Sequence, residues 1–119
     1  MTTQEIANRL VELCRQGQFD QALTELYAEN AVSIEPEGFA PKVEGLEGLR
    51  QKGKQYSEMI EELYGGEVSD AIVADDYFSV MMSQDVKFKG KERIKSSEIC
   101  VYHVKDGKIV SEQFFYDDM

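Results

Sequence analysis

Hydrophobic residues in the first half of the chain recur at intervals of three and four, which is the spacing of an amphipathic helix. This pattern predicts three helices. The first follows a candidate capping box of Thr2 and Glu5, the second begins at Phe19 and ends at Glu29-Asn30, and the third covers residues 46–63. The glycine pair 65–66 is expected to end the third helix in a left-handed conformation. The first two helices should pack together as a helical hairpin.

Later positions alternate between hydrophobic and polar, which is typical of strands. Residues 68–74 and 77–89 are predicted strands, separated by a short acidic turn. An earlier strand is predicted at residues 31–35, and Pro36 ends it because proline cannot donate to a strand ladder. This order of elements predicts one α+β domain with three helices, an early strand and an antiparallel meander.

The last quarter of the chain, residues 92–116, is predicted to form a long β-hairpin. Asp106 and Gly107 lie at its turn, and both residue types tolerate the positive φ of a tight turn. The first arm is apolar on both faces between Ile99 and Val104. Such a strand must be covered on both sides, so we expect helices on one face and a partner chain on the other.

Length and charge narrow the class of protein. The 119 residues suffice for one ordinary domain, residues 1–119, and no apolar run reaches the roughly 18 residues of a membrane span. The net charge of −10 repels phosphate, which argues against nucleic acid or an anionic membrane as a partner. The first ten residues lack the basic start and apolar block of a signal peptide, which predicts a cytoplasmic protein.

The cysteines and acidic residues show no metal-binding pattern. Cys14 and Cys100 lie in a predicted helix and a predicted strand, without paired spacing, and are expected to be buried thiols. No spacing of carboxylates resembles a calcium-binding loop. We therefore expect neither a metal ion nor an organic cofactor.

Three stretches carry a resemblance to a known family. They are residues 19–36, which include LYAENAVSIEP, the helix start at Gly45-Leu46, and VYHVKDGKIVSEQFFY at residues 101–116. With the order of elements, they make the chain similar to the nuclear transport factor 2-like superfamily, in its SnoaL-like polyketide cyclase and ketosteroid isomerase branch. The resemblance implies a cone-shaped α+β barrel whose curved antiparallel sheet wraps around three helices. It also implies a deep apolar pocket for a small ligand, and a homodimer formed through the outer sheet face.

The resemblance also implies one catalytic position. Isomerases of this branch carry an acidic residue before a proline at the first strand, and Glu35 precedes Pro36 here. A carboxylate in an apolar pocket can move a proton between carbon and oxygen, because desolvation raises its pKa toward neutrality. Alternation leaves a second interpretation open, in which Val32 and Ile34 are buried while Glu35 points to water.

The hydrogen-bond donors of the isomerases are not matched. Their helix-one tyrosine corresponds to Leu10, and their strand carboxyl corresponds to Cys100. Neither side chain is a good donor to an oxyanion. Steroid isomerisation by that mechanism is therefore not predicted.

Two further carboxylates, Glu98 and Glu112, fall on the pocket side by the same comparison. If they converge with Glu35, mutual repulsion would raise at least one pKa and leave a protonated donor beside an ionised base. Alternatively, they pair with Lys or Arg at a hydrated rim. The residues predicted to line the ligand pocket are Met82, Gln84, Cys100, Tyr102, Phe114 and Tyr116.

Two other ionisable residues are predicted to face away from the pocket. His103 shares the outer face with Ile99 and Val101, and Asp85 is expected to be a surface charge. Two functions remain open. One is a cofactor-independent acid–base enzyme for a small apolar carbonyl compound, and the other is a non-catalytic module that binds a small ligand or a partner.

Overall fold

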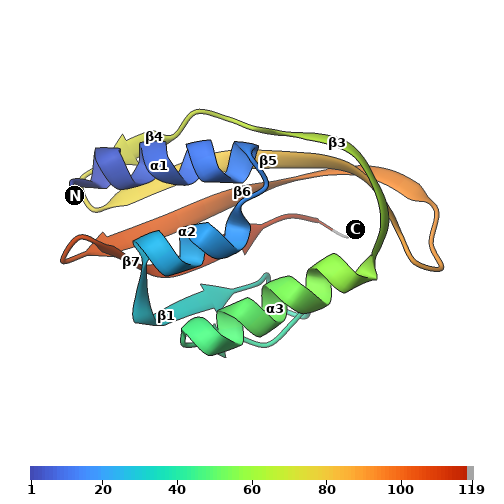
Figure 1. Ribbon diagram of the computed structural model, residues 1–119, viewed down its shortest axis with the longest axis horizontal. Helices are drawn as coiled ribbons and strands as arrows, with labels where there is room; N and C mark the ends of the chain where they lie inside the picture. Colours follow the sequence, from blue (N-terminus) through green and yellow to red (C-terminus); the bar gives the residue numbers. More distant parts are fainter. Residues whose placement is uncertain (118–119) are drawn as a thin grey trace.

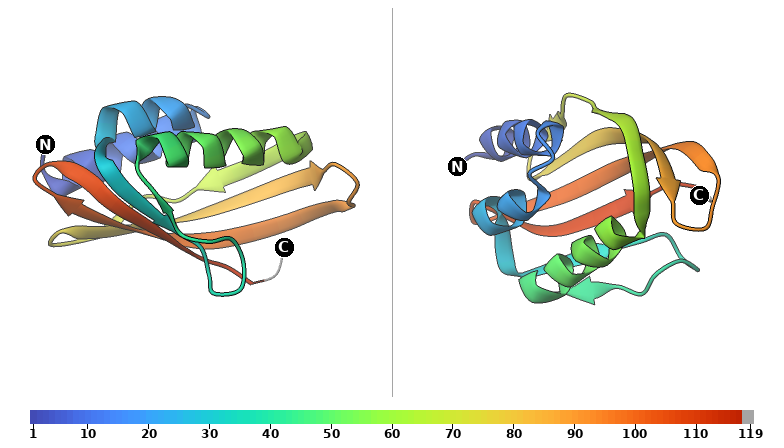
Figure 2. Two further views of the ribbon diagram at one scale, coloured as in Figure 1. Left: turned by 90° about the horizontal axis from the view of Figure 1, so that it is seen from below. Right: turned by 45° about the vertical axis from the view of Figure 1, so that its right-hand side comes forward.

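Three helices lie against one face of a curved sheet in the computed structural model, which describes residues 1–117 (Figure 1). Seen from below, the helices form one layer and the strands the other (Figure 2). The elements are α1 (Thr3–Arg15), α2 (Phe19–Leu26), β1 (Tyr27–Ile34), β2 (Val43–Glu44), α3 (Leu46–Met59), β3 (Ile60–Val68), β4 (Ile72–Ala74), β5 (Tyr77–Phe88), β6 (Arg93–Lys105) and β7 (Lys108–Phe115).

The seven strands form one sheet in the order β2-β1-β7-β6-β5-β3, with β4 also paired to β5. The α+β class and the curved sheet are confirmed, but two details differ from the prediction. The sheet is mixed, because β1 runs parallel to β7 while the other pairs are antiparallel. No hairpin joins these two strands, so nothing in the connection forces them to be antiparallel. The sheet is also unclosed, with β2 and β3 at its ends.

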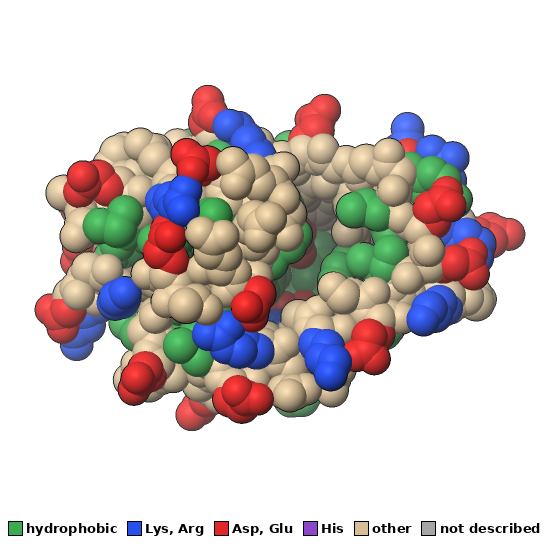
Figure 3. All heavy atoms as spheres, viewed as in Figure 1, with side chains coloured by type: hydrophobic (Ala, Val, Ile, Leu, Met, Phe, Trp, Pro, Cys, Tyr) green, Lys and Arg blue, Asp and Glu red, His purple; other side chains and the backbone are tan. Residues whose placement is uncertain are grey.

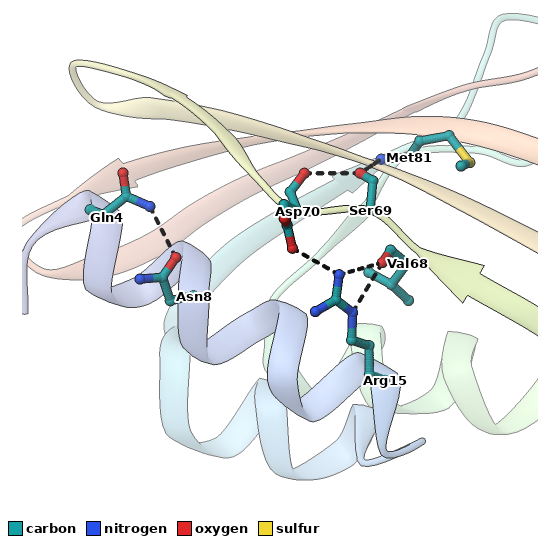
Figure 4. Close-up of polar contacts among 7 residues, drawn as sticks. All are labelled: Gln4, Asn8, Arg15, Val68, Ser69, Asp70 and Met81. Carbon is teal, nitrogen blue, oxygen red and sulfur yellow. Dashed lines mark hydrogen bonds and ion pairs between the residues drawn. The ribbon is translucent and has the colours of Figure 1, made fainter.

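The first helix is anchored at both ends. At its start the predicted capping box is confirmed: Thr2 Oγ1 accepts from the Glu5 amide at 3.1 Å, and Glu5 Oε1 accepts from the Thr2 amide at 2.8 Å. Near its end, Arg15 donates to the Val68 carbonyl and to Asp70 at distances of 2.8–3.0 Å (Figure 4). These contacts tie α1 to the segment that joins β3 and β4.

One core joins the helices to the sheet. The buried stripe of α1 packs with α2 and with the inner side chains of β5, β6 and β7. The fully buried members with the largest side chains are Phe78, Ile6, Leu10, Leu13, Leu26 and Ile109. Most of this core lies beneath α1 and α2, which cover one end of the sheet (Figure 1).

The third helix is shorter than predicted. It ends at Met59, and residues 60–68 form β3 along the edge of β5. Gly65 and Gly66 therefore lie in a strand, and the predicted helix end at this pair is wrong. A Cβ on Gly66 would lie 2.6 Å from the Ser83 carbonyl oxygen, so glycine permits the close approach of β3 to β5.

The region between the second and third helices also differs. β1 begins at Tyr27, earlier than the predicted strand 31–35, and shifts register against β7 before Val32. β2 is a short strand that was not predicted. The predicted strand 68–74 is divided, because Ser69 turns the chain by exchanging hydrogen bonds with the Met81 backbone (Figure 4).

The terminal hairpin is confirmed, with Asp106 at φ 52° and Gly107 at φ 74° in its turn. A register shift after His103 pairs Val104 with Ile109 instead of Val110. Ile109 is fully buried, while Val110 is half-buried. This register shift is a β-bulge. Beyond it the side chains of β7 alternate so that Glu112 lies opposite Tyr102.

Candidate functional site

The helical side of the sheet is hollowed between the α1–α2 pair and α3, and hydrophobic side chains line part of its wall (Figure 3). The concave faces of β5, β6 and β7 lie on this side. Met82 pairs with Glu98, and Cys100 pairs with Phe114, so these four side chains share the concave face. The site thus mixes apolar side chains with carboxylates.

Six side chains form a continuous polar network along one wall of the hollow. Tyr27 donates to Glu112 Oε1, and Ser33 donates to Glu112 Oε2 at 2.7 Å. Lys52 Nζ donates to Ser33 Oγ at 2.7 Å and to Glu35 Oε2 at 2.9 Å. The polar network consists of Tyr27, Glu112, Ser33, Lys52, Glu35 and, through a 2.5 Å bond to Glu35 Oε1, Tyr116.

Glu35 faces the site and not bulk water. Its side chain is 13% exposed, and Ser33, two residues earlier, is fully buried. The orientation follows from pairing: Ser33 lies beside Glu112 of β7, whereas Val32 and Ile34 lie beside Ser111 and Gln113. Long-range pairing therefore decides between the two interpretations that alternation left open. The catalytic role assigned to Glu35 stays a prediction.

Lys52 was not identified from the sequence. Leu49, Lys52 and Tyr56 follow one another at helical spacing on the side of α3 that is least exposed. The Lys52 ammonium lies 5.1 Å from the centre of the Phe114 ring and ends at Ser33 and Glu35. The signal available in the sequence was this position between Leu49 and Tyr56, since a lysine there must reach a polar group inside the site.

Glu98 differs from the other carboxylates of the site. Its one hydrogen bond within residues 1–117 comes from the Cys100 thiol, 3.6 Å from Oε1. Burial raises its pKa to about 7, and the negative charge of Glu35 adds to the shift. Burial and the nearby Glu98 also raise the pKa of Cys100, so this thiol stays protonated and can donate.

Glu112 lies deeper in the network. Burial raises its pKa, while the hydrogen bonds from Tyr27 and Ser33 and the charge of Lys52 oppose the shift. Glu35, Glu98 and Glu112 thus share one side of the sheet and influence one another electrostatically. Within residues 1–117, no three His, Cys, Asp or Glu side chains are arranged to hold a metal ion, so these carboxylates do not meet at one point.

The predicted lining residues occupy two levels. Tyr102 and Cys100 are buried in the floor, with the Tyr102 ring stacked on Phe78 at 4.7 Å. Above them, Met82 and Phe114 are partly exposed. The remaining two serve polar contacts: Tyr116 binds Glu35, and Gln84 donates to the Tyr56 hydroxyl at 2.5 Å. Tyr102 is only 2% exposed and therefore packs beneath the site.

The outer side of the sheet carries the other candidates. His103 stacks on Tyr77 with ring centres 4.4 Å apart. Arg93 donates to both carboxylate oxygens of Asp85, at 2.8 and 2.9 Å, in a bidentate ion pair at the surface. Ile99 and Phe115 are 46% and 48% exposed on this face.

A family model for the SnoaL-like domain matches residues 1–116. The chain belongs to the SnoaL-like family. The resemblance predicted from the sequence is therefore confirmed. A solved structure from Mesorhizobium loti, described as a proposed SnoaL-like polyketide cyclase and, in brackets, a carbohydrate phosphatase, is 37% identical. It superposes with a TM-score of 0.91 and covers 98% of this chain and 100% of its own.

More distant structures share the fold of this SnoaL-like domain. A proposed SnoaL-like polyketide cyclase from Jannaschia sp. CCS1 is 19% identical, with a TM-score of 0.79 over 98% of this chain and 87% of its own. A proposed isomerase from Bacillus subtilis is 21% identical, with a TM-score of 0.75 over 98% of this chain and 90% of its own. None of the curated proteins compared with this chain matches it. Within residues 1–117, no helix is long and apolar enough to cross a membrane.

Proposed function

We propose that this SnoaL-like domain is a cofactor-independent acid–base enzyme that moves a proton on a small apolar carbonyl compound. Glu98 is the group that takes and returns the proton. The observation that carries the proposal is a carboxyl group on the concave face with only a thiol donor on one oxygen, and burial raises the pKa of this group to about 7. A general base works best with a pKa near the working pH, where a large fraction is ionised and the conjugate acid still gives the proton back.

Glu98 suits this role better than Glu35, the residue that the resemblance favoured. Both oxygens of Glu35 are already engaged, one by Lys52 and the other by Tyr116. Those bonds would have to break before Glu35 could accept a proton from a substrate. Glu98 has only the weak thiol donor Cys100 on one oxygen, which leaves the other oxygen available.

The reaction breaks the C–H bond next to the carbonyl. The proton passes to the Glu98 carboxylate, and the electron pair of that bond moves to the carbonyl oxygen as an enolate. In a ketone with a neighbouring C=C bond, return of the proton from Glu98 to the far carbon of the conjugated enolate completes an isomerisation. In a cyclisation, the enolate carbon bonds to a second carbonyl carbon of the same molecule, and the oxygen of that carbonyl takes the electron pair of its C=O bond and then the proton from Glu98. The descriptions of the Mesorhizobium loti and Bacillus subtilis proteins as a cyclase and an isomerase support this class of chemistry.

The proposal is tested by a carboxyl-detected NMR titration of the ligand-free protein. Glu98 is expected to titrate near pH 7, with the Glu98→Gln variant identifying its resonance. If Glu98 instead titrates near the ordinary glutamate value of about 4.3, the proposal is wrong, and the hollow would then serve to bind a small ligand without catalysis.

We also propose that the outer face of the sheet forms a homodimer, as the family resemblance implies. Met81, Ile99, Val101 and Phe115 give this face an apolar centre on adjacent strands. Sedimentation equilibrium is expected to show a dimer, and Ile99→Lys is expected to shift it to monomer. Leu63→Lys, which alters an exposed side chain on β3 at the end of the sheet, should leave the dimer intact. A wild-type protein that sediments only as monomer contradicts the proposal.

The cytoplasmic location stays a prediction.

A further inference from the structure

The hydroxyl of Tyr56 accepts a hydrogen bond, whereas the hydroxyls of Tyr27 and Tyr116 donate one. Gln84 Nε2 donates to it at 2.5 Å, so the hydroxyl oxygen acts as an acceptor. Its ring and that of Phe88 pack edge to face, with ring centres 5.7 Å apart. Two contacts therefore fix the ring and the oxygen, while the hydroxyl proton has no acceptor among residues 1–117.

The hydroxyl protons of the polar network already have acceptors. Tyr27 and Ser33 both donate to Glu112, and Tyr116 donates to Glu35. Tyr102 is buried in the floor, against Phe78. Among these tyrosines, Tyr56 is thus the partly exposed residue whose hydroxyl proton is left to donate to a ligand.

Tyr56 also stands in the right relation to the proposed base. It projects from the inward stripe of α3, whereas Gln84 and Glu98 lie on the concave face of neighbouring strands, two residue pairs apart along the ladder. Burial raises the pKa of Tyr56, and the charges of Glu98 and Glu35 raise it further. The hydroxyl therefore remains protonated at neutral pH, close enough to Glu98 to feel its charge.

The charge of the site restricts the ligand. Three carboxyl groups, Glu35, Glu98 and Glu112, face the hollow with one cation, Lys52. An anionic ligand would meet net negative charge and would have to displace Lys52 from Glu35 to find a positive partner. An uncharged oxygen acceptor needs only a free donor, which Tyr56 supplies.

We propose that Tyr56, positioned by Gln84, donates a hydrogen bond to the carbonyl oxygen of an uncharged ketone bound in the hollow. This inference deepens the proposed function, because the same oxygen becomes the enolate oxygen when Glu98 removes the neighbouring proton. Tyr56 keeps its own proton and stabilises the oxygen through the hydrogen bond alone. It is a ligand-binding and oxyanion-stabilising residue, and Gln84 is its positioning residue.

The test compares two probes of the same shape, the ketone 2-tetralone and the hydrocarbon tetralin. The wild-type protein is expected to bind 2-tetralone more tightly than tetralin and to move the carbonyl ¹³C resonance of the bound ketone downfield. Tyr56→Phe should weaken 2-tetralone binding about 3- to 10-fold, which is the range of one net hydrogen bond, and should abolish the downfield shift. Tetralin binding should not change.

Two further variants separate hydrogen bonding from packing. Gln84→Glu keeps Tyr56 but offers its proton a carboxylate acceptor, so it should reproduce the loss of the ¹³C shift seen in Tyr56→Phe. Tyr64→Phe is the matched control, because Tyr64 is exposed on β3 with Arg93 over its ring, and it should behave as wild type.

Two outcomes overturn the inference. One is a wild-type protein that binds 2-tetralone no more tightly than tetralin, and the other is an unchanged ¹³C shift in Tyr56→Phe. Failure of the proposed function is seen separately, as unchanged exchange of the ketone's α-protons in Glu98→Gln. A carbonyl shift that depends on Tyr56 in a protein without such exchange would support the ketone site and reject the catalytic role.

Discussion

Replacing Glu98 with glutamine is expected to slow the exchange of the C1 protons of 2-tetralone for deuterium by about 10²- to 10⁴-fold, the usual contribution of a positioned general base. Glutamine keeps the size and polarity of the side chain but cannot accept the proton. Loss of signal in the ¹H NMR spectrum of the ketone measures the rate. The pH profile of the wild-type rate should rise with ionisation of a group whose pKa is about 7.

The controls for this prediction come from the same chain. Glu92→Gln changes an exposed carboxylate just before β6 and should leave the rate unchanged. Glu35→Gln should slow exchange less than Glu98→Gln, because Glu35 acts on Glu98 through its charge, while its own oxygens bind Lys52 and Tyr116. If Glu35→Gln abolishes exchange while Glu98→Gln does not, the two roles are reversed.

The parts of the fold that local signals specify were predicted well. A capping box begins the first helix, and an Asp-Gly turn closes the terminal hairpin, as expected from Thr2, Glu5, Asp106 and Gly107. The end of α3 was missed for the opposite reason. Ile60 and the residues after it continue the helical spacing, but they pair along β5, and that long-range ladder overrides local preference.

The candidate site was predicted in composition but not in arrangement. Glu35, Glu98 and Glu112 all lie on the concave side, yet which of them is free depends on Lys52 and Tyr116. Lys52 comes from a helix and Tyr116 lies just beyond the last strand, so no local pattern links either of them to Glu35. The inward orientation of Glu35 likewise depends on the parallel pairing of β1 with β7, two segments almost eighty residues apart.

The Glu98→Gln variant is also expected to stabilise the protein at alkaline pH. A carboxyl group whose pKa is raised by folding binds its proton more tightly in the folded state than in the unfolded state. The stability that the protonated group contributes is therefore fully present below its pKa in the unfolded state, and it is lost as the pH rises through its pKa in the folded state. For Glu98 the window runs from 4.5 to about 7. At about 1.4 kcal/mol per unit, ionisation of Glu98 costs on the order of 3 kcal/mol once the pH exceeds this window.

Urea denaturation at pH 4 and pH 8 measures the effect. Glu98→Gln and wild type are expected to have similar free energies of unfolding at pH 4, whereas at pH 8 the variant should be more stable by about 2 to 3 kcal/mol. Glu112 has a raised pKa too, but it is present in both proteins, so most of its contribution cancels in the difference. An equal or lower stability of the variant at pH 8 would show that ionised Glu98 is solvated, and a carboxylate solvated in that way would have neither the raised pKa nor the basicity that proton abstraction from carbon requires.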